Sequence, residues 1–223
     1  MSTLNVNTIT PNSGTTVTIG GSGDTVTLGS GASASGFSTP SGLNSVQVFT
    51  SSGTWTRPSG ITKVIMYVTG GGGNGGGSTG NNYYAGAGGG AGGTAIKFLD
   101  VSSISTSTIT VGSAAGASSW SDGTNTITGN PGNIGGTTSD TPGVGGTATG
   151  GDINLSGGDG LIRIDNARGG QGGSSYWGGT DSYPVSGTPS AATTYGTGGS
   201  ASSGGDAGGG AGAPGIVYVQ EYK

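Results

Sequence analysis

The sequence predicts an all-β protein, with a short N-terminal trimeric β-repeat stalk followed by a glycine-rich β-sandwich domain that contains polyglycine-II-like strands. Glycine supplies 56 of the 223 residues, far above its usual share of about 7%. The apolar residues gather in short alternating runs typical of strands, and the glycine tracts lie between these runs. Disorder is the alternative, but it usually accompanies high net charge, and the formal net charge here is only −4.

Ordering this much glycine requires a compensating interaction. Each glycine fixed in regular structure costs about 0.5–1 kcal/mol relative to alanine, whereas the net stability of a domain is only about 5–15 kcal/mol. Close packing with every backbone N–H and C=O bonded could offset this cost, and so could burial between identical subunits. Glycine chains in the polyproline-II conformation can lie side by side, which favours a packed bundle. Tight turns within a β sandwich are the alternative.

The composition argues against catalysis. The chain has no Cys and no His, which removes disulfides, thiolate metal sites and the Ser-His and Cys-His nucleophiles. No glycine run ends in the Gly-Lys-Ser or Gly-Lys-Thr of a phosphate-binding loop. Asp152, Asp159 and Asp165 could suggest a glycosidase acid pair or a calcium site, but their neighbours indicate turns. We therefore expect a protein that is not an enzyme and has no cofactor or metal.

Charge and hydropathy bear on partners and location. The 6 Lys and Arg residues are spread along the chain, so the phosphate contacts that drive nucleic-acid binding are missing. No run approaches the roughly 18 apolar residues of a membrane span, and residues 1–7 lack the features of a secretion signal. We expect synthesis as a soluble cytoplasmic product, with no nucleic-acid partner and no membrane insertion.

Three regions follow one another along the chain. Residues 1–35 contain a repeat of Thr-Val-Thr-Ile/Leu-Gly, at 16–20 and again at 25–29. Two strands of this length cannot bury a core alone, so the repeats need stacking partners, most simply other copies of the chain. This predicts an oligomerisation and attachment stalk in a homotrimer, or alternatively an arm that orders only on docking. Residues 36–45 resemble a linker, and residues 46–223 form the predicted glycine-rich β domain.

Period-two patterns locate the strands of this domain. Strands are predicted at residues 46–49, 61–69, 94–101, 106–111 and 216–222, with further candidates at 153–155 and 161–164. Residues 61–69 are apolar on both faces, which suggests burial on both sides, and Trp55 should cover this core. The strands at the two ends of the domain are expected to pair and close it.

Aromatic residues in irregular, polar stretches are the candidate binding residues. In loops, Tyr and Trp give a large contact area at low entropic cost, as in antibody paratopes. The predicted receptor-binding residues are Tyr83, Tyr84, Tyr176, Trp177, Tyr183 and Tyr195. The alternative is that these side chains fold back to cover the glycine scaffold.

The segment Phe-Thr-Ser-Ser-Gly-Thr-Trp-Thr-Arg-Pro-Ser-Gly-Ile at 49–61, with Lys63 and Val64, resembles the opening of the glycine-rich domain of phage tail-fibre proteins. Later landmarks at 89–95, 108–112 and 212–217 also fit, and residues 9–15 resemble the head of many marine phage fibre proteins. The resemblance covers about half of the chain, and residues 113–203 carry none of its landmarks. The chain also resembles tip adhesins in which a polyglycine-II sandwich presents variable loops.

The resemblance implies a trimeric protein of the virion, on the tail or capsid surface, attached through its N-terminus to other virion proteins. We expect a short tail-fibre-like adhesin that binds a glycan or protein of the host cell surface. A purely structural subunit, such as a capsid decoration fibre or an extracellular filament protein, is the alternative. An enzyme such as a depolymerase is disfavoured because His and a convincing acid pair are missing.

Overall fold

The computed structural model describes residues 42–78, 84–137, 140–165, 168–179, 189–203 and 208–223, with a few single positions before residue 31. The chain divides into two units, Met1–Pro40 and Ser41–Lys223. The repeat predicted at 16–20 and 25–29 lies outside the described residues, apart from Thr27. Within the described part of the chain, no helix is long and apolar enough to cross a membrane.

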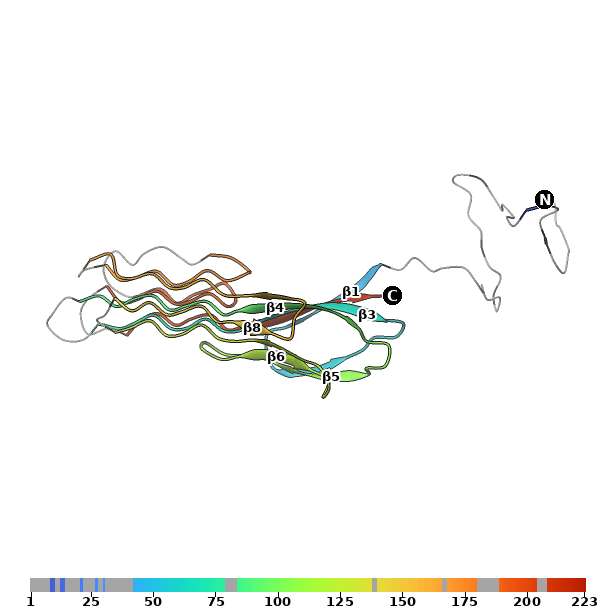
Figure 1. The fold of residues 1–223 in the computed structure, drawn as a ribbon, viewed down its shortest axis with the longest axis horizontal. Helices are drawn as coiled ribbons and strands as arrows, with labels where there is room; N and C mark the ends of the chain where they lie inside the picture. The colour runs from blue at the N-terminus through green and yellow to red at the C-terminus, as the bar shows by residue number, and fades with distance from the viewer. Residues whose placement is uncertain are drawn as a thin grey trace. The chain divides into compact units, whose positions relative to one another are not determined.

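The second unit contains two antiparallel sheets that face each other, which confirms the all-β prediction (Figure 1). Sheet A has the strand order β1-β10-β3-β4-β9, and sheet B has the order β2-β5-β6-β7-β8. The strands are β1 (Leu43–Phe49), β2 (Gly53–Thr56), β3 (Lys63–Thr69), β4 (Thr94–Asp100), β5 (Thr106–Thr110), β6 (Ser118–Ser121), β7 (Thr126–Gly129), β8 (Ala148–Thr149), β9 (Ile153–Leu155) and β10 (Ile216–Tyr222).

The first and last strands close the domain, as predicted. β1 pairs with β10 along its length, from Leu43 opposite Tyr222 to Phe49 opposite Val217, and β10 then pairs with β3. The strand predicted at 161–164 is wrong, because these residues lie outside both sheets in an extended segment. Strands β2, β6, β7 and β8, none longer than four residues, were not among the predicted strands.

The core lies between the sheets. Val64, Met66 and Val68 on the inner face of β3 are fully buried, and so is Trp55, as expected. The ring of Trp55 lies 6.4 Å from that of Trp120, between their centroids. The outer face of β3 is only half-buried, so the prediction that both faces are covered holds fully for the inner face alone.

A buried carboxylate anchors Trp55. Glu221 on β10 is fully buried, and its Oε1 accepts hydrogen bonds from Trp55 Nε1 at 2.8 Å and Gln47 Nε2 at 2.7 Å. Ser45 Oγ donates to Oε2 at 2.5 Å. These three donors replace the water that the carboxylate loses, so the burial of Glu221 is compensated.

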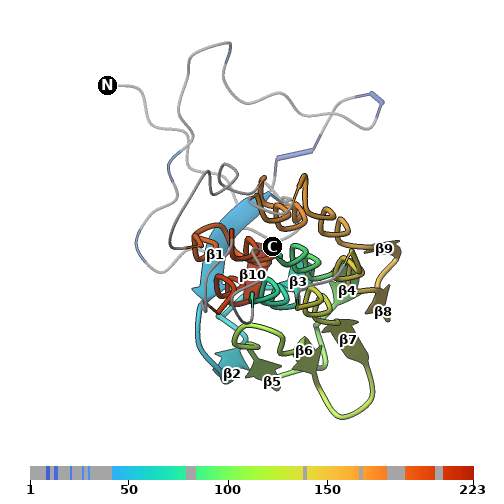
Figure 2. The same ribbon diagram turned by 90° about the vertical axis from the view of Figure 1, so that its left-hand side faces the viewer.

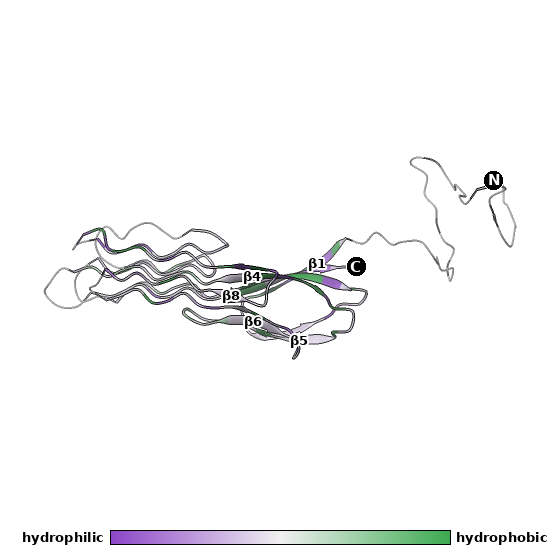
Figure 3. Ribbon diagram, in the orientation of Figure 1, coloured by the Kyte–Doolittle hydropathy of each residue, from purple (hydrophilic) through white to green (hydrophobic). Residues whose placement is uncertain are grey.

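Strands of both sheets continue into extended glycine tracts that pack beside one another (Figure 1). We call these tracts the glycine bundle: residues 70–78, 84–93, 130–137, 140–147, 156–165, 168–174, 189–203 and 208–215. Seen along their length, the tracts appear as small coils lying side by side (Figure 2). The strongly apolar residues lie mainly on the strands of the sandwich, whereas the bundle is close to neutral in hydropathy (Figure 3).

Hydrogen bonds in the bundle repeat every three residues. In the tract 84–93, the N–H groups of Gly86, Gly89 and Gly92 donate to Ser202, Gly199 and Gly196 of one neighbouring tract. The next residue of each triplet donates to the tract 130–137, and the third donates to the tract 156–165. This three-residue repeat is the signature of polyglycine-II packing, because the helix has three residues per turn.

The tract 84–93 is surrounded by neighbours. Its carbonyl groups accept hydrogen bonds from three further tracts, 70–78, 140–147 and 168–174, so six tracts contact it. An added Cβ at Gly89 or Gly90 would come closer than 3.0 Å to a neighbouring backbone oxygen. The predicted packed bundle, with backbone groups hydrogen-bonded between neighbouring tracts of the chain, is therefore confirmed, and the tracts do not form tight turns.

Candidate functional site

The distal end of the glycine bundle, away from the sheets, brings together residues that are far apart in sequence. Arg163 Nε lies 2.7 Å from Asp140 Oδ1, and its guanidinium carbon lies 5.2 Å from the centre of the Tyr84 ring. The three residues come from three different tracts, which meet here because consecutive tracts reverse direction at this end. We call Tyr84, Asp140 and Arg163 the tip cluster.

Exposed apolar side chains flank Arg163 of the tip cluster along the chain. Leu161, Ile162 and Ile164 are 45%, 54% and 48% exposed, and Tyr84 is 42% exposed. The side chain of Arg163, by contrast, is only 19% exposed, because it packs between its two partners. Exposed apolar groups next to an arginine and an aromatic ring are the composition that marks protein recognition surfaces.

Of the residues predicted to bind a receptor, the four that the structure describes do not form one surface. Tyr84 lies in the tip cluster, whereas Trp177 contacts Thr69 at the sheet end of the bundle. The tract 70–78 separates these positions, and its nine residues span about 28 Å at ~3.1 Å per residue. Tyr83 and Tyr183 lie outside the described residues.

Tyr176, Trp177 and Tyr195 belong to an arrangement that covers sheet A. Trp177 Nε1 donates to Thr69 Oγ1 at 2.8 Å, and Ser175 Oγ donates to the Tyr195 carbonyl at 2.6 Å. Tyr67, Tyr176, Trp177 and Tyr218 form an aromatic cluster, with ring centroids between 5.2 and 6.1 Å apart. These contacts match the alternative in which the aromatic side chains fold back onto the scaffold.

The aromatic cluster also changes the chemistry of Tyr67. Burial raises the pKa of the Tyr67 hydroxyl above its usual value, and the neighbouring Tyr176, Tyr222 and Tyr218 hydroxyls raise it further. Tyr67 therefore stays neutral over the whole physiological pH range. A neutral ring packed among other rings contributes to covering the sheet.

Sequence reasoning missed Asp140, Arg163 and the exposed isoleucines beside them. The segment Leu-Ile-Arg-Ile at 161–164 has the alternating pattern of a strand, and this pattern concealed its place in the bundle. The signal that could have placed this segment correctly is its position just before the connection between two glycine tracts. In a bundle of antiparallel tracts such connections must lie at an end of the bundle, where apolar side chains have no core to enter.

The three aspartates expected in turns all accept hydrogen bonds from backbone N–H groups or pair with basic side chains. Asp152 accepts hydrogen bonds from Lys97 Nζ at 2.6 Å and Phe98 N at 2.9 Å, and Asp159 accepts one from Gly145 N at 2.8 Å. Asp165 pairs with Arg168 at 2.7 Å. Among the residues that the structure describes, no group of three or more His, Cys, Asp or Glu could hold a metal ion.

The hydrogen bond from Lys97, followed by that from Phe98, lowers the pKa of Asp152 below its usual value. A lowered folded-state pKa means that Asp152 stabilises the fold above its unfolded pKa of about 3.9, and that this contribution is lost as the pH falls through the folded pKa. We expect Asp152→Asn to lower the unfolding midpoint at neutral pH and to match the wild type in strong acid. Denaturation at both pH values measures this, and a difference that persists unchanged in acid would contradict it.

The profile of a family described as a glycine-rich domain matches residues 46–161, about half of the chain. The chain belongs to this glycine-rich domain family. The matched region of the glycine-rich domain runs from β1 through β9 and includes the Trp55 segment and the tract 84–93. Strand β10, which closes sheet A, follows it. A comparison with curated protein sequences found no match.

Proposed function

We propose that the protein is a virion structural protein, a short tail-fibre-like adhesin that binds the host cell surface through the distal end of its glycine bundle. The tip cluster is the observation that carries this proposal. It gathers an aromatic ring, a charged pair and exposed isoleucines from three tracts at one end of the domain. Such a surface fits a glycan or a protein of the host envelope.

The bundle is suited to present this surface. Its tracts are fixed by backbone hydrogen bonds to several neighbours at once, so the turns at their ends start from a rigid support. Loops carried by a rigid scaffold are common sites of recognition, because their sequence can vary without loss of the fold. The resemblance of the Trp55 segment to tail-fibre domains supports the same reading.

The remaining parts of the proposal concern assembly. The repeats before residue 35 would hold the chain in a homotrimer and join it to other virion proteins, on the tail or capsid surface. The protein would be made in the host cytoplasm, act without catalysis, and neither bind nucleic acid nor insert into a membrane.

Binding can be tested with fluorescently labelled protein on a panel of intact bacterial strains and on an array of bacterial surface glycans. We expect the double variant Tyr84→Ala/Arg163→Ala to bind at least about tenfold more weakly than the wild type, since anchor residues of this type each contribute more than about 1 kcal/mol. Thr108→Ala, on the exposed face of sheet B, is the matched control. Binding that survives the double variant, or that Thr108→Ala weakens equally, would rule out the tip cluster as the site.

A purely structural role is the second candidate, and one observation favours it. The outer face of sheet A carries several exposed apolar residues, including Val48 and Phe98 at 54% and 52%, as expected for a subunit that packs in an assembly. A correctly folded protein that binds neither the strains nor the glycans, yet assembles into particles or filaments, would favour this role over the adhesin.

A further inference from the structure

The two outer faces of the sandwich differ in chemistry. On sheet B, one row across four strands reads Thr54, Thr108, Ser121 and Thr126. These hydroxyl-bearing residues are exposed or half-exposed, as expected for the solvated face of an antiparallel sheet. Sheet B therefore shows what the water-facing surface of this domain looks like.

The outer face of sheet A is apolar instead. One row across all five strands reads Val48, Tyr218, Tyr67, Ile96 and Ile153. The two ends of this row are 54% and 53% exposed, at Val48 and Ile153. Trp177 and Tyr176 pack against the middle of the row, so the chain itself covers only part of the face.

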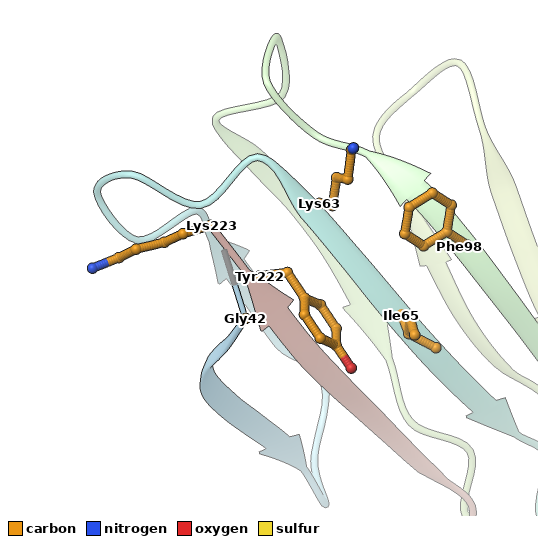
Figure 4. Close-up of a pocket in the computed structure, with 6 residues that line it drawn as sticks. All are labelled: Gly42, Lys63, Ile65, Phe98, Tyr222 and Lys223. Atoms are coloured by element: carbon orange, nitrogen blue, oxygen red, sulfur yellow. The ribbon is translucent and has the colours of Figure 1, made fainter. Parts of the chain in front are cut away.

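The apolar surface continues away from the bundle. The next row reads Val46, Gln220, Ile65 and Phe98. Gln220 is its polar member, and Val46 and Phe98 are 41% and 52% exposed. Beyond it lies a pocket of about 280 Å³ lined by Ile65, Phe98 and Tyr222 together with Lys63 and Lys223 (Figure 4). Contiguous apolar patches of this kind mark interaction sites in soluble proteins.

We propose that the outer face of sheet A packs against other copies of this chain. This inference rests on the proposed assembly through residues 1–35. β1, whose Val46 and Val48 lie on this face, begins at Leu43, only a few residues after that segment. Copies that assemble through residues 1–35 are thereby tethered next to one another at β1. Tethering raises the effective concentration of the faces, so even a modest surface becomes an interface.

The face alone is too small for a stable interface, and its charges are compatible with self-packing. Four strands of seven residues and the three-residue β9, at about 4.8 Å between strands and about 3.3 Å per residue, give roughly 490 Å², which is below the ~800 Å² per partner of a stable interface. The stalk would supply the remainder. The charges at the far end of the face have both signs, with Lys63 directly opposite Asp100 in the register, so self-packing does not juxtapose charges of one sign only.

The test uses the full chain and its oligomeric mass by light scattering over a concentration series. Val48→Glu and Phe98→Glu should each weaken self-association at least tenfold, whereas Thr108→Glu on sheet B should leave it unchanged. Circular dichroism spectra confirm that each variant is folded. If both sheet A variants assemble like the wild type, the proposal is overturned.

A second measurement avoids placing a charged residue on sheet A. Because the chain has no Cys, Val48→Cys and the control Thr108→Cys each carry a single nitroxide label. We expect the label at 48 to be immobilised and to show dipolar coupling to labels of other copies, while the label at 108 stays mobile. A mobile label at 48 overturns the proposal. An immobilised label in a monomeric protein also overturns it, because the chain's own N-terminal segment would then be the occupant.

The interface is independent of receptor binding at the tip. Variants of the tip cluster should keep the oligomeric mass of the wild type, and loss of cell binding alone would leave this inference intact. If Val48→Glu loses self-association but each chain still binds cells, the assembly interface and the receptor-binding site are distinct.

Discussion

Replacing Gly90 with alanine should destabilise the whole domain. A Cβ at this position would overlap the backbone of Val144 in the neighbouring tract, and backbone cannot rotate away as a side chain can. Overpacking of a closely packed interior costs about 1–3 kcal/mol, and we expect a loss at or above this range. Chemical denaturation of the wild type and the variant measures it.

Gly208→Ala is the matched control, because a Cβ at Gly208 meets no atom within 4 Å. There the substitution should be neutral, or stabilising by up to ~1 kcal/mol, since it restricts the unfolded chain. Equal stability losses at Gly90 and Gly208 would show that glycine is needed for flexibility rather than for close approach, and the packed-bundle explanation would fail.

Removing Trp55 should have the second large effect. Trp55→Ala empties a fully buried position in the core and leaves the Glu221 carboxylate without one of its donors. Truncation of a buried Trp costs about 3–5 kcal/mol. The same change at Trp177, which is only half-buried on the outer face of sheet A, should cost clearly less. Unfolding midpoints of the two variants compare these positions directly.

Trp55→Phe separates the hydrogen bond from the packing. It keeps a ring in the core but removes the indole N–H, and should cost about 1–3 kcal/mol because the buried acceptor is left short of a partner. In a Glu221→Leu background this cost should shrink, giving a coupling of about 0.5–3 kcal/mol in a double-mutant cycle. An unchanged cost in that background would mean that Glu221 does not hold Trp55.

The sequence predicted the parts of this fold in which side chains alternate. The inner face of β3 and the run at 216–222 have clear period-two patterns, and both are strands where expected. Strand β8 has only two residues and no readable period. The segment 161–164 has a strand-like sequence but belongs to a glycine tract, where Leu161 bonds to the tracts 84–93 and 168–174.

The candidate site was harder to predict, for a physical reason. Loop aromatics suggested one surface, but a chain that reverses after every tract sends its turns alternately to two ends of the bundle. Tyr84 and Trp177 thus lie at opposite ends, although both are aromatic residues in glycine-rich surroundings. Arg163 is recognisable only once the tracts are known to be neighbours, because its partner Asp140 lies in a different tract.

The three-residue repeat of the hydrogen bonds has a consequence for evolution. Sliding a tract by one triplet restores the same pattern of partners, so the tracts themselves do not specify their alignment. The strands of the sandwich must set it, as when the pairing of Thr69 with Thr94 fixes where the tract 70–78 begins and where the tract 84–93 ends. Inserting one triplet into every tract would therefore move the tip outward by about 9 Å, at ~3.1 Å per residue. The length of the glycine bundle can change in fixed steps while the β sandwich and the loops at the tip stay the same.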